Sequence, residues 1–143
     1  MDNWLCTHAG VAPGIAGIIP PEIITAGAAK IAAWLNEEFQ REMREPVPTS
    51  GAGLHQRYGS GPLFQFHRCR LGSDPYGGIF WFDPIGEMVD PSPLVGRQIF
   101  GHTPVPYPEI GTDWINLNAF EDDGVWIFDT EENGLLDLTE LAD

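Results

Sequence analysis

The sequence contains few positive charges. Its 143 residues include 7 Lys and Arg against 21 Asp and Glu, which gives a formal net charge of −14, and Lys30 is the only lysine. A surface with this much negative charge repels a nucleic-acid backbone and anionic lipid headgroups. We therefore expect neither nucleic acid nor a membrane among the partners. A phosphate ester is compatible with this charge where a divalent metal ion supplies the positive field.

Cysteine and long apolar runs are also scarce. Cys6 and Cys69 are the only cysteines, and because they form no metal-ligand spacing we expect reduced, buried or half-buried thiols. No apolar segment is long enough to cross a bilayer. Asp2 and Trp4 stand where a signal peptide would have a positive start and an apolar run. These features together predict a cytoplasmic protein.

The rest of the composition is typical of a folded domain. Hydrophobic residues make up 43% of the chain, which includes 8 Phe, 3 Tyr and 5 Trp. A chain of this length can bury a core within one unit. We therefore predict a single domain over residues 1–143.

Two apolar segments are each expected to form a strand that ends at a histidine. Residues 3–7 and 97–102 have the composition of short buried strands, and His8 and His102 stand at their ends, each next to small residues that begin a turn. A histidine at the junction of strand and loop is rigidly placed and can reach a cleft, as a metal ligand or general acid must. The alternative for each is a hydrogen-bonded structural histidine.

The longest predicted element is an amphipathic helix from about Pro21 or Thr25 to Arg44. Its apolar side chains recur every four residues and are expected to face the core: Ile31, Leu35, Phe39 and Met43. Its acidic side chains are expected to form a solvated face: Glu37, Glu38, Glu42 and, just beyond the helix, Glu45.

The other segments are assigned from turn residues and apolar runs. Residues 9–21 are expected to form a loop and residues 79–82 a strand. Towards the carboxyl terminus, three segments are expected to form an antiparallel meander of strands: residues 114–118, 124–129 and 135–138.

Residues 53–78 form a long glycine-rich connection that concentrates positive charge: His55, Arg57, His67, Arg68 and Arg70. A guanidinium group can hold a phosphoryl oxygen bidentately, and Arg70 is our candidate catalytic residue for that role. The alternative is that these arginines pair with the surplus carboxylates. Asp83 is expected either to accept a hydrogen bond from a neighbouring histidine or to start a turn.

Three stretches together resemble a known family. His-Ala-Gly-Val at residues 8–11 and Gly-His-Thr-Pro at residues 101–104 resemble the last two conserved elements of the calcineurin-like metallophosphoesterases, which include serine/threonine phosphoprotein phosphatases and diadenosine tetraphosphatases. Gly-Gly-Ile-Phe-Trp-Phe-Asp-Pro at residues 77–84 is similar to the family strand that ends in a Trp-x-Asp-Pro-like segment. The resemblance covers about residues 4–138. It implies a mixed α/β (α+β) fold, half of an αββα sandwich, with one mainly antiparallel sheet and a long amphipathic helix.

The resemblance also implies a metal site. In complete family members two divalent ions activate a bridging water for in-line attack on a phosphoryl group, and His8 and His102 correspond to two ligands of one ion, which would be Mn, Fe or Zn. The motifs that supply the other ligands, Asp-x-His, Gly-Asp-x-x-Asp-Arg and Gly-Asn-His-Asp or Glu, do not occur in the 143 residues. Residues 118–120 read Asn-Ala-Phe where family members often have Asp-Thr-Gly.

Two imidazoles alone would form a weak and open metal site. The sequence therefore predicts a metal-dependent phosphoesterase half-domain that is inactive alone, with a dinuclear centre only when the missing half is supplied. Such a half would expose an apolar face, so we expect a second polypeptide that carries the amino-terminal motifs, or self-association. The alternatives are a non-catalytic binding or regulatory protein derived from a phosphoesterase, and a fragment of a longer enzyme.

Overall fold

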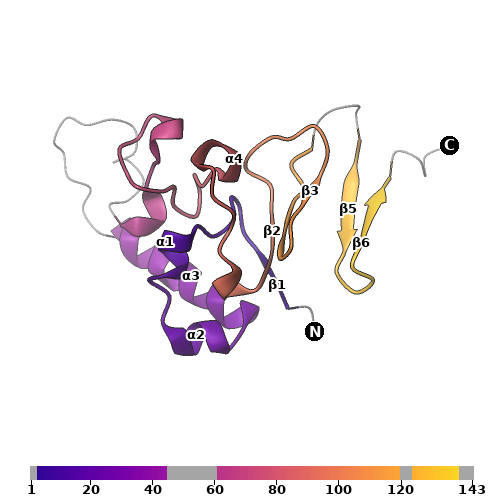
Figure 1. Cartoon of the computed structure of the whole chain (residues 1–143). Helices are drawn as coiled ribbons and strands as arrows, with labels where there is room; N and C mark the ends of the chain where they lie inside the picture. Colours follow the sequence, from indigo (N-terminus) through magenta and orange to yellow (C-terminus); the bar gives the residue numbers. More distant parts are fainter. Residues whose placement is uncertain (1–2, 45–60, 120–123, 139–143) are drawn as a thin grey trace.

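The computed structural model describes residues 3–44, 61–119 and 124–138. These residues form a four-stranded sheet with the strand order β1-β2-β4-β3 and a separate two-stranded sheet of β5 and β6 (Figure 1). The mixed α and β class is thereby confirmed. The strands are β1 (Trp4–Cys6), β2 (Arg97–Phe100), β3 (Glu109–Ile110), β4 (Trp114–Asn116), β5 (Trp126–Asp129) and β6 (Gly134–Asp137).

The larger sheet is mainly parallel, so the expectation of a mainly antiparallel sheet is wrong. β1 pairs in parallel with β2, and β2 pairs in parallel with β4, whereas only β3 and β4 are antiparallel. Leu5 lies opposite Gln98, and Ile99 lies opposite Ile115. Parallel pairing needs a long crossover, and the connection from β1 to β2 contains the helices of the chain.

Two of the three strands predicted near the carboxyl terminus pair as expected. β5 and β6 form an antiparallel hairpin in which Trp126 lies opposite Asp137. β4 does not join them, because its pairing positions are taken by β2 and β3. The predicted meander is therefore wrong in its first strand.

The strand predicted at residues 79–82 is also wrong, because this apolar stretch forms a tight turn. The backbone N–H groups of Trp81 and Phe82 both donate to the carbonyl of Gly78, at 3.0 and 2.9 Å. A Cβ atom on Gly78 would lie 2.0 Å from the carbonyl oxygen of Leu63, so only glycine fits there. Phe82 is fully buried, which accounts for the apolar composition of a segment that is not a strand.

Among the described residues, three α-helices precede this region: α1 (Pro13–Ala16), α2 (Pro21–Thr25) and α3 (Ala28–Arg44). The helix predicted to end at Arg44 does so, but it is interrupted at Gly27, whose φ is 88°. The loop predicted at residues 9–21 contains α1. Pro13 begins that short helix, since proline at the first position has no N–H group to satisfy.

The faces of α3 depart from the expectation at its carboxyl-terminal end. Glu42, expected in a solvated face, is only 1% exposed, and Gly61 packs against its carboxylate. Met43, expected in the core, is 48% exposed. Glu45 lies outside the described residues.

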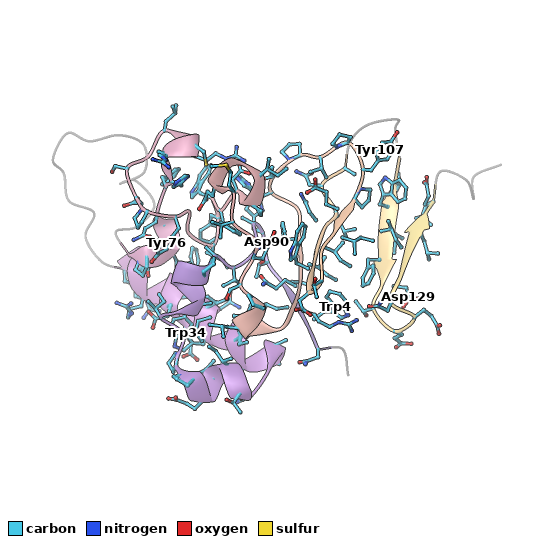
Figure 2. The ribbon with its side chains drawn as sticks, viewed as in Figure 1. Trp4, Trp34, Tyr76, Asp90, Tyr107 and Asp129 are labelled. Carbon is cyan, nitrogen blue, oxygen red and sulfur yellow. The ribbon has the colours of Figure 1, made fainter. Side chains whose placement is uncertain are left out.

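The helices and the hairpin cover opposite faces of the larger sheet (Figure 1). Leu5 on β1 is buried in the core formed with α1 and α3. The neighbouring residue Trp4 (Figure 2) points the other way, because side chains alternate along a strand. The centroid of its ring lies 5.0 Å from the ring centroid of Phe128 on β5. Arg97 on β2 stacks on Trp4, with its Cζ atom 4.3 Å from the ring centroid. Its Nη2 atom also donates to Oδ1 of Asn133 in the hairpin turn.

The remaining helical segments are short: η2 (Pro62–Phe64), η3 (Arg68–Arg70), α4 (Pro84–Glu87) and η4 (Pro93–Val95). Over the described ranges, every helix is too short or too polar to span a membrane. Cys6 and Cys69 are free thiols, as expected, but both are exposed rather than buried.

Candidate functional site

His8 and His102 meet at one edge of the larger sheet. β1 and β2 are adjacent and parallel, so the loops that follow them leave the sheet at the same edge. Nε2 of His8 and Nδ1 of His102 lie 2.9 Å apart, and the ring centroids are 4.8 Å apart. The two histidines that were predicted as metal ligands are therefore in direct contact, although 94 positions separate them in the chain.

Backbone hydrogen bonds fix the turn that carries His8. Gly101 donates its N–H to the carbonyl of His8 at 3.0 Å, which joins the two histidine loops. Gly10 has a φ of 86°, and a Cβ atom there would lie 3.2 Å from the ring of Phe100. Its N–H donates to Oγ1 of Thr7 at 3.0 Å. The turn thus requires glycine both for its conformation and for its close packing.

Two asparagines at the end of β4 hold the loop that carries His102. Nδ2 of Asn116, which is 2% exposed, donates to the carbonyl of Thr103 at 2.9 Å. Nδ2 of Asn118 donates to the carbonyl of His102 at 3.1 Å, and its own N–H donates to Oδ1 of Asn116 at 3.1 Å. Sequence reasoning treated Asn118 only as a departure from the family pattern and did not single out Asn116. The signal available in the sequence was that both asparagines lie at the end of a predicted strand, as the two histidines do.

Arg70 lies beside the histidine pair but is already engaged. Its Nη2 atom is 3.0 Å from Oδ2 of Asp83 and donates to Oγ1 of Thr103, the residue after His102, at 3.3 Å. Asp83 also accepts the N–H of Gly86 at 2.9 Å and so caps α4. Asp83 therefore starts a turn, as one of the two expectations had it. Arg70 pairs with the carboxylate of Asp83 and also lies next to the candidate site.

The other basic residues of that connection do not reach the pair in the part of the chain that is described. Arg68 is exposed, and His67 contacts Cys69. His55 and Arg57 lie outside the described residues.

The surroundings of His102 favour its neutral form. Burial is the largest cause that lowers the pKa of His102, and the electrostatic effects of Arg70 and then His8 add to it. Together they bring this pKa to about 4, against the opposing effect of Asp83. Nε2 of His102 is buried and has no hydrogen-bond partner among the residues with described positions. At neutral pH the imidazole is thus uncharged, and one ring nitrogen has a lone pair available to a cation.

An apolar hollow adjoins the pair along the free edge of the sheet. β1 is an edge strand and, within the described ranges, pairs only with β2. Beside it lies a hollow of about 280 Å³ between β1 and α3. A second hollow of about 300 Å³ adjoins it and is lined by His8, Phe39, Met43, Phe64, Phe80 and Trp81.

A second group of potential ligands was missed by sequence reasoning. His67 and Cys69 on the η3 turn and Glu87 at the end of α4 each offer one ligand atom, and these atoms lie within 4.8 Å of one another. Burial, with the nearby carboxylates of Asp83 and Glu87, raises the pKa of the Cys69 thiol. The ligands come from the η3 turn and from the separate short helix α4, so they do not form a compact sequence motif.

The histidine pair fits two ligands of one cation. Two imidazole nitrogens on a tetrahedral zinc ion lie about 3.4 Å apart, so a small separation of the two rings from the observed 2.9 Å would let one cation contact both. No third histidine, cysteine or carboxylate joins them among the described residues. Alone, the pair therefore offers fewer ligands than a complete metal site needs. Comparisons of the chain with protein-family models, curated proteins and solved structures find no match.

Proposed function

We propose that this chain is the carboxy-terminal half of a calcineurin-like metallophosphoesterase, corresponding to half of an αββα sandwich, and that it supplies two metal ligands to a phosphoesterase site completed by a second polypeptide. The observation that carries the proposal is the 2.9 Å approach of His8 Nε2 and His102 Nδ1 at the ends of adjacent parallel strands. The family resemblance assigns these same two residues to one metal ion.

His8 and His102 would hold a divalent ion from one side. When bound, such an ion polarises the phosphoryl group and activates water. The contribution of this chain is to present two imidazoles in fixed positions, which the hydrogen bonds of Asn118 and Gly101 maintain. The remaining ligands would come from the partner, because two imidazoles alone bind a cation weakly.

Arg70 is the residue of this chain that we assign to a phosphoryl oxygen. It donates a hydrogen bond to the side chain of Thr103, the residue after His102, and its own side chain is 31% exposed. Asp83 holds one guanidinium nitrogen and so fixes the orientation of the group. The part of the guanidinium that Asp83 does not occupy can then donate to a substrate oxygen.

The edge of β1 supports the proposed partner. Within the described part of the chain, one edge of β1 is unpaired and has an apolar hollow beside it, and such an edge is suited to accept a further strand. His8 borders both hollows, so a strand added to β1 would end next to the histidine pair. A partner that docks there could bring its ligands to the same cation.

The proposal is tested by manganese binding to the purified chain and by hydrolysis of a generic aryl phosphate. We expect weak binding that is abolished in His8→Ala and in His102→Ala, and no turnover by the chain alone. The measurements are made in a Cys69→Ser background, so that the second ligand group does not contribute. Robust turnover that survives His102→Ala would refute the site.

The same titration decides the alternative of a non-catalytic relic. The two histidines can also form a direct N–H···N hydrogen bond without any cation. A chain that binds no manganese or zinc at this pair, alone or with its partner, would be a binding or regulatory protein, and the phosphoesterase proposal would be wrong.

A further inference from the structure

His67, Cys69 and Glu87 form a group whose chemistry differs from that of the histidine pair. It offers one imidazole nitrogen, one sulfur and one carboxylate oxygen, and the three atoms lie within 4.8 Å of one another. We propose that this group is a separate zinc site that fastens the η3 turn to α4. The proposal does not depend on the phosphoesterase function.

The closest pair of ligands is already in place. Nδ1 of His67 lies 3.1 Å from Sγ of Cys69. It also accepts the Cys69 N–H at 3.4 Å, a long hydrogen bond that zinc would replace, because this nitrogen has one lone pair. In a tetrahedral zinc site, nitrogen and sulfur ligands lie about 3.6 Å apart. A small rotation of the exposed Cys69 side chain would therefore bring both atoms to binding distance.

Glu87 provides a fixed third ligand. Its side chain is 9% exposed, and its carboxylate accepts hydrogen bonds from the N–H groups of Gly77 at 3.0 Å and Asp83 at 3.0 Å. These bonds hold the carboxylate in one orientation. Oε1 accepts two of them, and Oε2, which accepts only the bond from Gly77, keeps a further lone pair for a cation. A buried carboxylate held in this way beside an imidazole and a thiol is a partly assembled site.

The ligand types select the metal. Thiolate and imidazole ligands favour zinc over the harder ions Mg, Ca and Mn, which prefer oxygen. Three protein ligands leave a fourth position for water. When zinc binds, the Cys69 S–H proton passes to solvent as the Zn–S bond forms.

A cation here would also order the neighbouring candidate site. Arg70 directly follows Cys69 in η3, and Asp83 caps the helix that Glu87 ends. The Arg70–Asp83 ion pair already joins these two turns at 3.0 Å. Zinc would join them a second time, so it would restrict Arg70 without touching the histidine pair.

Cobalt provides a specific test, because cobalt bound to a thiolate has a charge-transfer band in the near ultraviolet that cobalt bound to imidazoles lacks. The full chain is stripped with a chelator and titrated with Co²⁺, and then with Zn²⁺ to displace it. We expect a band that saturates at one cobalt per chain, disappears in Cys69→Ser, and persists in Cys6→Ser and in His102→Ala. Cys6 is the matched control because it is the other exposed thiol.

Two more variants test the other ligands. Glu87→Gln can still accept the two backbone hydrogen bonds, and with His67→Asn it is expected to weaken zinc binding at least about 10-fold, the smallest loss typical of an outer-shell partner. Circular dichroism checks that each variant is folded. A wild-type chain without the band, a band that survives Cys69→Ser, or unchanged zinc affinity in both folded variants would overturn the site.

Discussion

Asn116 donates its side-chain N–H to the carbonyl of Thr103 at 2.9 Å, and so ties the strand β4 to the loop after β2 that carries His102. Asn116 also accepts the N–H of Asn118, which in turn holds the carbonyl of His102. The position of His102 therefore depends on side chains of the neighbouring strand as well as on its own backbone.

We expect Asn116→Ala to destabilise the protein by about 2–4 kcal/mol. The change leaves the buried carbonyl of Thr103 without its partner, at about 1–3 kcal/mol, and the half-buried N–H of Asn118 without its partner, at about 1 kcal/mol, the lower end of that range. Urea denaturation measures the loss. Asn36→Ala is the control, since Asn36 is exposed on α3 and alanine is the better helix former. Equal stability of the two variants would contradict the assigned role of Asn116.

Gly10→Ala is expected to destabilise the protein by about 1–2 kcal/mol, the cost of placing an L-residue in a left-handed conformation. Its φ is 86°, and the new methyl group would press on the ring of Phe100 at 3.2 Å. Gly17→Ala is the matched control. Gly17 has a φ of −67° and its nearest neighbour would be 3.4 Å away, so alanine there is expected to be neutral or to stabilise by about 0.4–1 kcal/mol. Thermal unfolding of both variants provides the comparison.

The pKa of His102 in the metal-free protein is expected to be about 4, chiefly because the side chain is buried. The unfolded chain, with a histidine pKa of 6.5, takes up the proton first as the pH falls. The contribution of His102 to the free energy of unfolding is therefore fully present above about pH 6.5 and is lost progressively between about pH 6.5 and 4. An NMR titration of the imidazole resonances measures the pKa, and a value near 6.5 would contradict the described environment.

Two substitutions should move the pKa of His102 in opposite directions. Arg70→Met removes a positive charge that lowers this pKa, so the pKa should rise. Asp83→Asn removes a negative charge that raises it, so the pKa should fall, while asparagine can still cap α4. The same NMR titration reads both variants. Shifts of the same sign would show that the charges of Arg70 and Asp83 do not act on His102 in the way their positions indicate.

The sequence was most informative where a short strand ended in a polar residue. The strands before His8 and His102 and the end of the long helix at Arg44 were predicted from composition, turn residues and periodicity, and all three are observed. The contact of the two histidines was expected from the family resemblance. Its physical reason, parallel pairing of β1 and β2, was not predicted, because strand direction depends on the crossover and not on the strand residues.

The sequence was least informative where irregular turns are buried. Residues 79–82 are apolar because the turn is packed inside the protein, and an apolar run of this length does not distinguish a strand from another buried segment. Glu42 is buried against Gly61, which no helical periodicity could indicate. The group of His67, Cys69 and Glu87 depends on two such turns meeting, so it could be found only in three dimensions.

The last prediction concerns the partner that we place on β1. Thr7 donates its N–H to Ile99 on β2 at 3.0 Å, and in a parallel ladder the backbone groups of alternate residues point to opposite sides. The N–H and carbonyl of Cys6 therefore face the free edge. Cys6→Pro should leave the pairing with β2 in place but prevent a further strand from adding, because proline has no N–H to donate.

The measurement is a pull-down from the native host, with mass spectrometry to identify a polypeptide that contains the Asp-x-His and Gly-Asn-His motifs. The wild-type chain and the Cys6→Ser control are expected to capture it, and Cys6→Pro is expected not to, while its thermal unfolding shows that it is still folded. Capture of that polypeptide by folded Cys6→Pro would move the interface away from β1. A wild-type chain that sediments as a monomer and captures no such polypeptide would contradict the split phosphoesterase itself, because nothing would then supply the missing metal ligands.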